Sequence, residues 1–160
     1  MPPNPPSASS PSVRAALAEA SQLHRAGRLA EAGDAYRTLA SADPNFMPAI
    51  HGLALVTSDL GHPARAMPLI ARCVAAEPDN LAYRCGFGVI ALAMNKPDAA
   101  ATALLPAANA SPMHAEPRLL LSRALGALGR WDEAHSIMTD TTAAFPARAD
   151  LWAWQGRCAR

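Results

Sequence analysis

Histidine and cysteine are the residues of this 160-residue chain whose chemistry suits metal binding or nucleophilic catalysis. The histidines and cysteines are His24, His51, His62, His114, His135, Cys73, Cys85 and Cys158. No two histidines have the four-residue spacing that presents both rings to one metal on a helix. The cysteines are odd in number and widely separated, which indicates neither a disulfide framework nor a zinc site. We therefore expect no metal, no cofactor and no catalytic residue.

Charge and hydropathy exclude further classes of function. Fourteen Lys and Arg are balanced by thirteen Asp and Glu, so the formal net charge is +1. Nucleic-acid binding needs a basic stripe that displaces counterions, and the cations here are spread along the chain. No stretch approaches the ~20 apolar residues that cross a bilayer. The first twelve residues lack the basic start and apolar run of a secretory signal. We expect a cytoplasmic protein that neither inserts in membranes nor binds nucleic acid.

The chain repeats itself every 34 residues, and this period organises the rest of the sequence. Three columns that keep it are Pro44, Pro78, Pro112 and Pro146; Ala32, Ala66, Ala100 and Ala134; and Gly27, Gly61, Asn95 and Gly129. A fixed spacing of this length is typical of stacked supersecondary units. Apolar residues make up 51% of the chain, enough to give such a stack a core.

Each repeat reads as two helices separated by the glycine column. The first helices are predicted at about 13–26, 47–60, 81–94 and 115–128, and the second at about 29–42, 63–76, 97–110 and 131–144. Gly, and after it Asn, is the residue that tolerates the left-handed end of a helix. Pro63 and Pro97 suit a first helical turn. Pro106 lies inside its predicted helix, where it removes a hydrogen bond, so we expect that helix to be kinked or shortened.

These boundaries divide the chain into a tail and a repeat domain. Residues 1–12 are rich in Pro and Ser and are expected to be a disordered tail. The domain covers 13–160, with repeats at 13–46, 47–80, 81–114 and 115–148 and a partial fifth at 149–160. That last segment carries Trp152 and Trp154, one of which has no obvious packing partner. Either the array continues in a longer chain, or this helix docks on a partner or on a second copy of the chain.

The repeat columns resemble the tetratricopeptide repeat, a 34-residue helix–turn–helix unit. Repeat two shows the resemblance well, with Leu53, Ala54, Ala66, Ile70 and Pro78 at the characteristic positions. The early aromatic position departs from the pattern, since it holds Ala16, Ile50, Arg84 and Arg118 in the four full repeats. The resemblance implies an all-α fold, a right-handed superhelical α-solenoid of stacked antiparallel hairpins.

The resemblance also implies an inner face lined by the first helix of each repeat. The residues it assigns to a partner-binding groove are Leu17, Ser21, His51, Gly52, Leu55, Cys85, Gly86, Val89, Leu92, Leu119, Arg123 and Arg157. The cations and amides of a carboxylate clamp are absent in repeats one to three, and so is an asparagine ladder. We expect an apolar groove with small floor residues at Gly52 and Gly86 and positive charge at Arg123 and Arg157.

Such a groove suits an apolar or amphipathic segment of a protein partner that bears an acidic group. The leading hypothesis is therefore a non-catalytic scaffold or adaptor. Two alternatives stay open: the N-terminal region of a larger glycosyltransferase or sulfotransferase, and a chaperone of the type III secretion class. Self-association through the C-terminal helix with Trp152 and Trp154 is also left open, as is the reactivity of Cys85 on the inner face.

Overall fold

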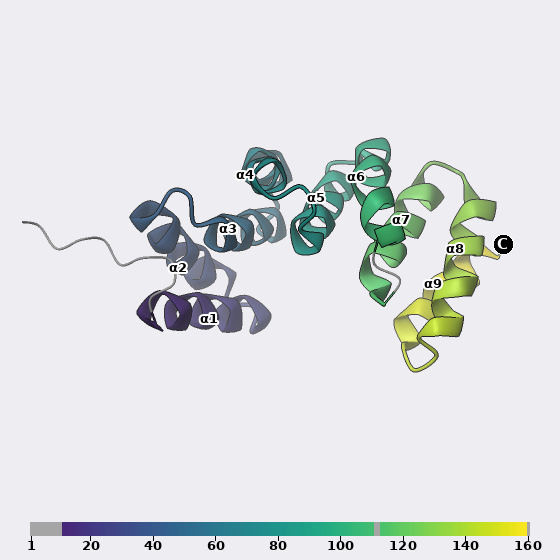
Figure 1. Ribbon diagram of the computed structural model, residues 1–160, viewed down its shortest axis with the longest axis horizontal. Helices are drawn as coiled ribbons and strands as arrows, with labels where there is room; N and C mark the ends of the chain where they lie inside the picture. Colours follow the sequence, from purple (N-terminus) through teal and green to yellow (C-terminus); the bar gives the residue numbers. More distant parts are fainter. Residues whose placement is uncertain (1–10, 111–112, 160) are drawn as a thin grey trace, which may run out of the picture. The chain divides into compact units, whose positions relative to one another are not determined.

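The computed structural model describes residues 11–110 and 113–159, and within them it contains nine α-helices and no strand (Figure 1). The helices are α1 (Pro11–Arg25), α2 (Leu29–Ala42), α3 (Met47–Asp59), α4 (Pro63–Ala76), α5 (Leu81–Ala93), α6 (Pro97–Ala110), α7 (Ala115–Ala127), α8 (Trp131–Ala144) and α9 (Ala149–Cys158). The fold is an all-α helical-repeat solenoid built from antiparallel hairpins. No helix of the described residues is long and apolar enough to span a bilayer.

Helix boundaries follow the repeat closely. All four second helices begin and end where the period predicts, and the first helices agree within two residues. The tail was expected to end at residue 12, but α1 begins two residues earlier, with Pro11 and Ser12 in its first turn. Proline is tolerated at the start of a helix, where its missing N–H has no intrahelical partner. The rest of the expected tail, 1–10, lies outside the described residues.

The turn inside each hairpin has the left-handed backbone that the glycine column predicts. The φ angles are 74° at Gly27, 85° at Gly61, 74° at Gly129 and 55° at Asn95. Asn95 is the only described non-glycine residue with positive φ, and asparagine tolerates this region better than most residues. The second helices α4 and α6 begin at Pro63 and Pro97, as expected.

The expectation of a shortened helix at Pro106 is wrong. Helix α6 runs through the proline for 14 residues, the same length as α2, α4 and α8. Buried Leu104 and Ala107 flank the proline, so packing on both sides holds the segment helical despite one lost backbone bond. The guanidinium of Arg84 donates to the carbonyl of Ala103 at 3.1 Å, which adds a bond beside the interruption.

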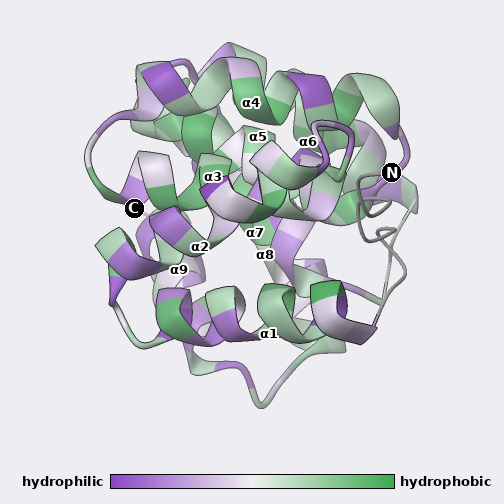
Figure 2. Ribbon diagram, turned by 90° about the vertical axis from the view of Figure 1, so that its left-hand side faces the viewer, coloured by the Kyte–Doolittle hydropathy of each residue, from purple (hydrophilic) through white to green (hydrophobic). Residues whose placement is uncertain are grey.

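The helices form two compact units, Met1–Pro78 (unit 1) and Asp79–Arg160 (unit 2). In unit 1 the hairpins α1–α2 and α3–α4 are joined by packing of α3 against α2 and α1. Tyr36 and Val56 lie in its core with Ala20 and Ala32, and leucines of α1, α2 and α3 surround them. The helices of this unit mix hydrophobic and hydrophilic positions around their circumference, as amphipathic packing requires (Figure 2).

Unit 2 contains the hairpins α5–α6 and α7–α8 followed by α9. Here α7 packs on α5 and α6, and α9 packs on α8. Asn80 caps α5 by accepting from the backbone N–H groups of Ala82 (3.1 Å) and Tyr83 (3.3 Å). The largest fully buried side chains of this unit include Ile90, Leu104, Leu120, Met138 and Leu151.

Candidate functional site

The residues assigned to the groove are divided between the two units. Unit 1 holds Leu17, Ser21, His51, Gly52 and Leu55, and unit 2 holds Cys85, Gly86, Val89, Leu92, Leu119, Arg123 and Arg157. In unit 2, three of these residues line one concavity, together with three further residues of α9. This concavity is the candidate site.

We call this concavity the inner hollow. It has a volume of about 380 Å³, and its lining residues are Leu119, Arg123, Asp150, Ala153, Trp154 and Arg157. Residues four apart lie on one helix face, so α7 presents Leu119 with Arg123 and α9 presents Ala153 with Arg157. The hollow therefore joins an apolar surface to two guanidinium groups.

Trp154 is held in place by a buried hydroxyl. Its indole N–H donates to Ser122 Oγ at 2.7 Å, and Ser122, which is fully buried on α7, donates in turn to the carbonyl of Ala134 at 3.1 Å. Gly126 lies against two rings, because a Cβ at this position would lie 2.8 Å from Trp131 Cζ3 and 3.3 Å from Trp154 Cζ2. The wall that Trp154 contributes to the hollow is thus positioned before any partner binds.

The charge of the inner hollow is positive. Asp150 accepts two bonds from Arg148, at 2.8 and 2.6 Å, and this pairing lowers the pKa of the Asp150 carboxyl. The Arg157 guanidinium carbon lies 5.8 Å from the centre of the Trp154 ring, within cation–π range. Among the described residues, no carboxylate forms a salt bridge with Arg123 or Arg157. Both guanidinium groups remain able to bind an anion.

Unit 1 corrects one assignment made from the sequence. Gly52 is buried against the ring of Tyr36, so it belongs to the packing between repeats and not to an open floor. Gly86, the equivalent residue of unit 2, is also buried. Ser21 donates to the carbonyl of Leu17 at 2.9 Å and lies 3.2 Å from Tyr36 Oη, so its hydroxyl is already engaged.

His24 of unit 1 has structural contacts. His24 Nε2 lies 2.7 Å from Asp59 Oδ2, and its ring meets the edge of Tyr36 with centroids 6.5 Å apart. These contacts join α1 to α2 and α3, consistent with a polar packing role. No group of three or more His, Cys, Asp or Glu in the described part of the chain could hold a metal ion.

Cys85 is half-buried, and burial raises the pKa of its thiol to about 11. The same cause raises the pKa of the buried Cys73 thiol to about 11. Since the thiolate is the nucleophile, both groups are poor nucleophiles near neutral pH. The reactivity that the sequence left open for Cys85 therefore has no support in its surroundings.

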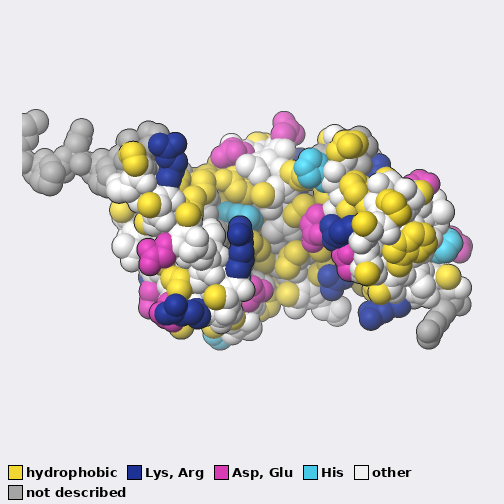
Figure 3. Space-filling model, turned by 90° about the horizontal axis from the view of Figure 1, so that it is seen from below, with side chains coloured by type: hydrophobic (Ala, Val, Ile, Leu, Met, Phe, Trp, Pro, Cys, Tyr) yellow, Lys and Arg dark blue, Asp and Glu magenta, His cyan; other side chains and the backbone are white. Residues whose placement is uncertain are grey.

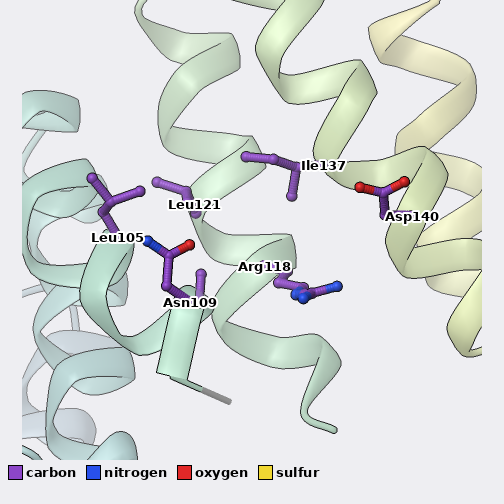
Figure 4. A pocket seen from close by; sticks show the side chains of 7 residues that line it. Leu105, Asn109, Arg118, Leu121, Ile137 and Asp140 are labelled. Carbon is purple, nitrogen blue, oxygen red and sulfur yellow. The ribbon is translucent and has the colours of Figure 1, made fainter. Parts of the chain in front are cut away.

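A second concavity lies on the side of unit 2 formed by α6, α7 and α8. It was not predicted from the sequence. This outer hollow has a volume of about 170 Å³, and Leu105, Leu121 and Ile137 meet in it beside Asn109, Arg118 and Asp140 (Figure 4). Leu105 is 52% exposed. The residues at the same position of the other repeats are Arg37, Ala71 and Thr139. A leucine in a column of otherwise polar or small residues was therefore the signal available in the sequence.

Comparison with known proteins gives one family match. The family model described as tetratricopeptide repeat matches residues 91–158, which lie within unit 2. No curated protein matches the sequence significantly.

Three solved structures illustrate how widely the fold is shared. TTC0263, a thermophilic TPR protein of Thermus thermophilus, superposes with a TM-score of 0.82 at 18% identity over 91% of this chain and 80% of its own. MamA MSR-1 gives 0.73 at 24% identity over 89% and 82%. YrrB, described as a TPR protein with an unusual peptide-binding site, gives 0.70 at 21% identity over 89% and 74%. These likenesses establish the fold.

Proposed function

Because this chain belongs to the tetratricopeptide-repeat family, we propose that it is a non-catalytic scaffold that binds a protein partner. The partner segment enters the inner hollow of unit 2, and it carries an apolar side chain next to an acidic group. This assignment is finer than the general protein-binding role that the family supports.

The observation that carries the proposal is the pairing of an apolar wall with two guanidinium groups that form no salt bridge with any carboxylate of residues 11–110 and 113–159. Leu119 and the Trp154 ring supply the wall, and Arg123 and Arg157 supply the charge. Arginine binds carboxylates through a planar, two-pronged donor geometry, so it favours an acidic side chain or a terminal carboxylate. An apolar segment without an acidic group would leave both guanidinium groups without a carboxylate to bind.

The inner hollow is also preformed on the side of α9. Trp154 is fixed by Ser122, and Asp150 is neutralised by Arg148, so neither has to rearrange when a segment binds. A preorganised surface loses little conformational entropy on association. We propose that binding leaves the helices of unit 2 in place.

We also propose that the protein acts in the cytoplasm. Its three cysteines are free thiols, two of them buried, and free thiols persist in a reducing compartment. The absence of a disulfide in so small a domain agrees with stabilisation by its hydrophobic core alone.

The test uses two fluorescein-labelled decapeptides with identical leucines, one carrying three glutamates and the other three glutamines. We expect the glutamate peptide to bind at least 10-fold more tightly by fluorescence anisotropy, with an affinity that falls as salt rises. The double substitution Arg123→Gln and Arg157→Gln should remove this preference. The matched control replaces two exposed arginines of unit 1, Arg25→Gln and Arg65→Gln.

Equal binding of the two peptides would refute recognition of an acidic group by this surface. An equal loss from the unit 1 control would show that only the overall charge of the protein matters. Circular dichroism of all variants should be unchanged, because both pairs of arginines are exposed.

A further inference from the structure

We infer that the outer hollow binds a free α-amino acid with a branched apolar side chain, such as leucine. Arg118 binds its carboxylate, and Asp140 binds its ammonium group. The outer hollow lies within unit 2 and shares no lining residue with the inner hollow, so the inference does not depend on the proposed function.

The apolar lining of the outer hollow comes from three helices. Helix α7 packs against both α6 and α8 and forms the floor between them. Leu105, Leu121 and Ile137 are contributed by α6, α7 and α8 in turn, and they follow one another across the hollow (Figure 4). Leu121 is buried, Ile137 is half-buried and Leu105 is largely exposed. The hollow is therefore packed against unit 2 below and open to solvent above.

Three polar side chains lie at one end of this lining. They are Asn109 of α6, Arg118 of α7 and Asp140 of α8. Each is three or four positions from the apolar residue of its own helix, so it shares a helix face with that residue. Because α7 runs antiparallel to α6 and α8, all three lie at the same end. In Figure 4 the guanidinium of Arg118 extends from α7 toward α8, which carries Asp140.

The two charges at this end are opposite in sign and are not paired. Within residues 11–110 and 113–159, neither Arg118 nor Asp140 forms a salt bridge with the other or with a third residue. Arg118 is half-buried and Asp140 is exposed. One cation and one anion beside an apolar lining are complementary to a ligand that carries one charge of each sign next to an apolar group. An α-amino acid has this arrangement.

The groove continues beyond the outer hollow but offers no further free charge among the described residues that line it. An adjoining concavity of about 250 Å³ shares the three apolar lining residues and extends to Arg130 and Glu133. These two are joined by two hydrogen bonds of 2.7 Å, so each charge is already neutralised. A ligand therefore places its charged groups beside Arg118 and its apolar atoms farther along the groove.

Size and charge spacing favour a single amino acid over a peptide. The outer hollow has a volume of about 170 Å³. A cavity of roughly 150 Å³ admits a benzene-sized group, which is close to the size of a leucine side chain. Pockets for drug-sized ligands begin at about 300 Å³. In an extended peptide the terminal ammonium and carboxylate are separated by about 3.3–3.6 Å per residue. A longer peptide therefore cannot bring both termini to the same end of the hollow.

The overall field of the protein does not select the ligand. The formal net charge is +1, and on the face shown in Figure 3 Lys and Arg side chains lie next to Asp and Glu side chains. Such a surface attracts neither anions nor cations strongly over a distance. Recognition at the outer hollow therefore depends on its two local charges and its apolar lining.

The experiment is a titration of the ¹⁵N-labelled whole chain followed by ¹H–¹⁵N correlation spectra. We expect a dissociation constant on the order of 1 mM, because leucine has few atoms and the hollow is open on one side, so leucine is added to about 20 mM. The amide signals of Leu105, Leu121 and Ile137 should shift and saturate. Glycine, which has no side chain, should cause no saturable shift.

Two leucine derivatives test the two charges separately, since leucinamide lacks the carboxylate and N-acetylleucine lacks the ammonium group. Each should bind about 5-fold more weakly than leucine, as expected for the loss of one exposed ion pair. Arg118→Gln should weaken leucine by a similar factor without weakening leucinamide. Asp140→Asn should weaken leucine without weakening N-acetylleucine. A general folding defect would weaken all three ligands together.

The matched controls remove one charge of each sign at exposed positions elsewhere, Arg25→Gln on α1 and Asp132→Asn on α8. Both variants should bind leucine as the wild-type protein does. Leucine that causes no saturable shift would overturn the inference. Equal binding of leucine and its two derivatives would also overturn it, because the charges would then play no part.

A trileucine peptide blocked at both ends tests the other possible occupant. If it binds more tightly than leucine, the groove is a docking surface for a protein segment and the inference is wrong. Binding of the glutamate decapeptide should be the same in Arg118→Gln as in the wild-type protein. Failure of the outer hollow and failure of the inner hollow are therefore distinguished.

Discussion

Replacing Gly52 by alanine should destabilise unit 1, although alanine is the better helix former. Gly52 lies within α3, and a Cβ at this position would lie 2.7 Å from Tyr36 Cδ1 and closer still to Cε1 and Cζ. The Tyr36 ring has little room to withdraw. It is 4% exposed, its hydroxyl lies 3.2 Å from Ser21 Oγ, and its edge meets His24.

The expected magnitude follows from two opposing effects. Glycine to alanine inside a helix gains about 1 kcal/mol of helix propensity. Moving the ring back to an ordinary contact requires a shift of roughly 1 Å in a packed core, and such overpacking costs about 1–3 kcal/mol. We expect Gly52→Ala to lower the free energy of unfolding by up to about 2 kcal/mol, because the helix gain offsets part of the clash.

Urea unfolding followed by far-ultraviolet circular dichroism measures this change. Gly156→Ala is the matched control, since its added methyl meets no atom within 4 Å and should stabilise the protein by about 0.5–1 kcal/mol. The clash itself is isolated by a double-mutant cycle with Tyr36→Leu, whose flexible side chain can yield. In that background Gly52→Ala should be neutral or stabilising.

The reasoning is refuted if Gly52→Ala stabilises the protein as much as Gly156→Ala does. A loss that persists unchanged in the Tyr36→Leu background would also refute it, since the ring would then not be the cause. Either result would show that the Tyr36 ring does not limit the space at Gly52.

Three further predictions concern the Ser122 hydroxyl and the thiols of Cys73 and Cys85. Ser122→Ala should lower the free energy of unfolding by about 1–3 kcal/mol and shift tryptophan fluorescence, because the Trp154 N–H loses its buried acceptor. Alkylation by iodoacetamide at pH 8 should be roughly 200-fold slower at Cys73 and Cys85 than at a free cysteine, because their pKa is about 11. Burial favours the protonated thiol, so its contribution to stability is complete below pH 9 and declines toward pH 11, as pH-dependent urea midpoints would show.

The local structure could be predicted from the sequence because it depends on short-range chemistry. Glycine or asparagine is favoured in the left-handed turn, and proline fits a helix start or follows a helix end. Gly27, Asn95 and Pro63 therefore mark helix boundaries in the sequence. The shortening expected at Pro106 was wrong for the opposite reason. Whether a helix survives an interior proline depends on the packing of its neighbours, here Leu104 and Ala107.

The candidate site was predicted in part. Leu119, Arg123 and Arg157 were assigned to one face, and the structure brings them together because α7 and α9 present the same repeat columns. Gly52 was misplaced because a glycine column does not reveal which ring lies against it. The outer hollow escaped notice because it combines residues of three helices, and its one local signal was an exposed leucine at Leu105.

The 34-residue period by itself determined the helices, their turns and the helical-repeat fold, because each of these follows from residues close together in the chain. The tertiary structure decided which side chains of those helices remain exposed to solvent. It turned Trp154 inward onto Ser122 and left Trp152 exposed, although the two residues are neighbours in the sequence. Successive helical positions are rotated by about 100°, and only the packing of α9 on the rest of unit 2 selects which direction is buried.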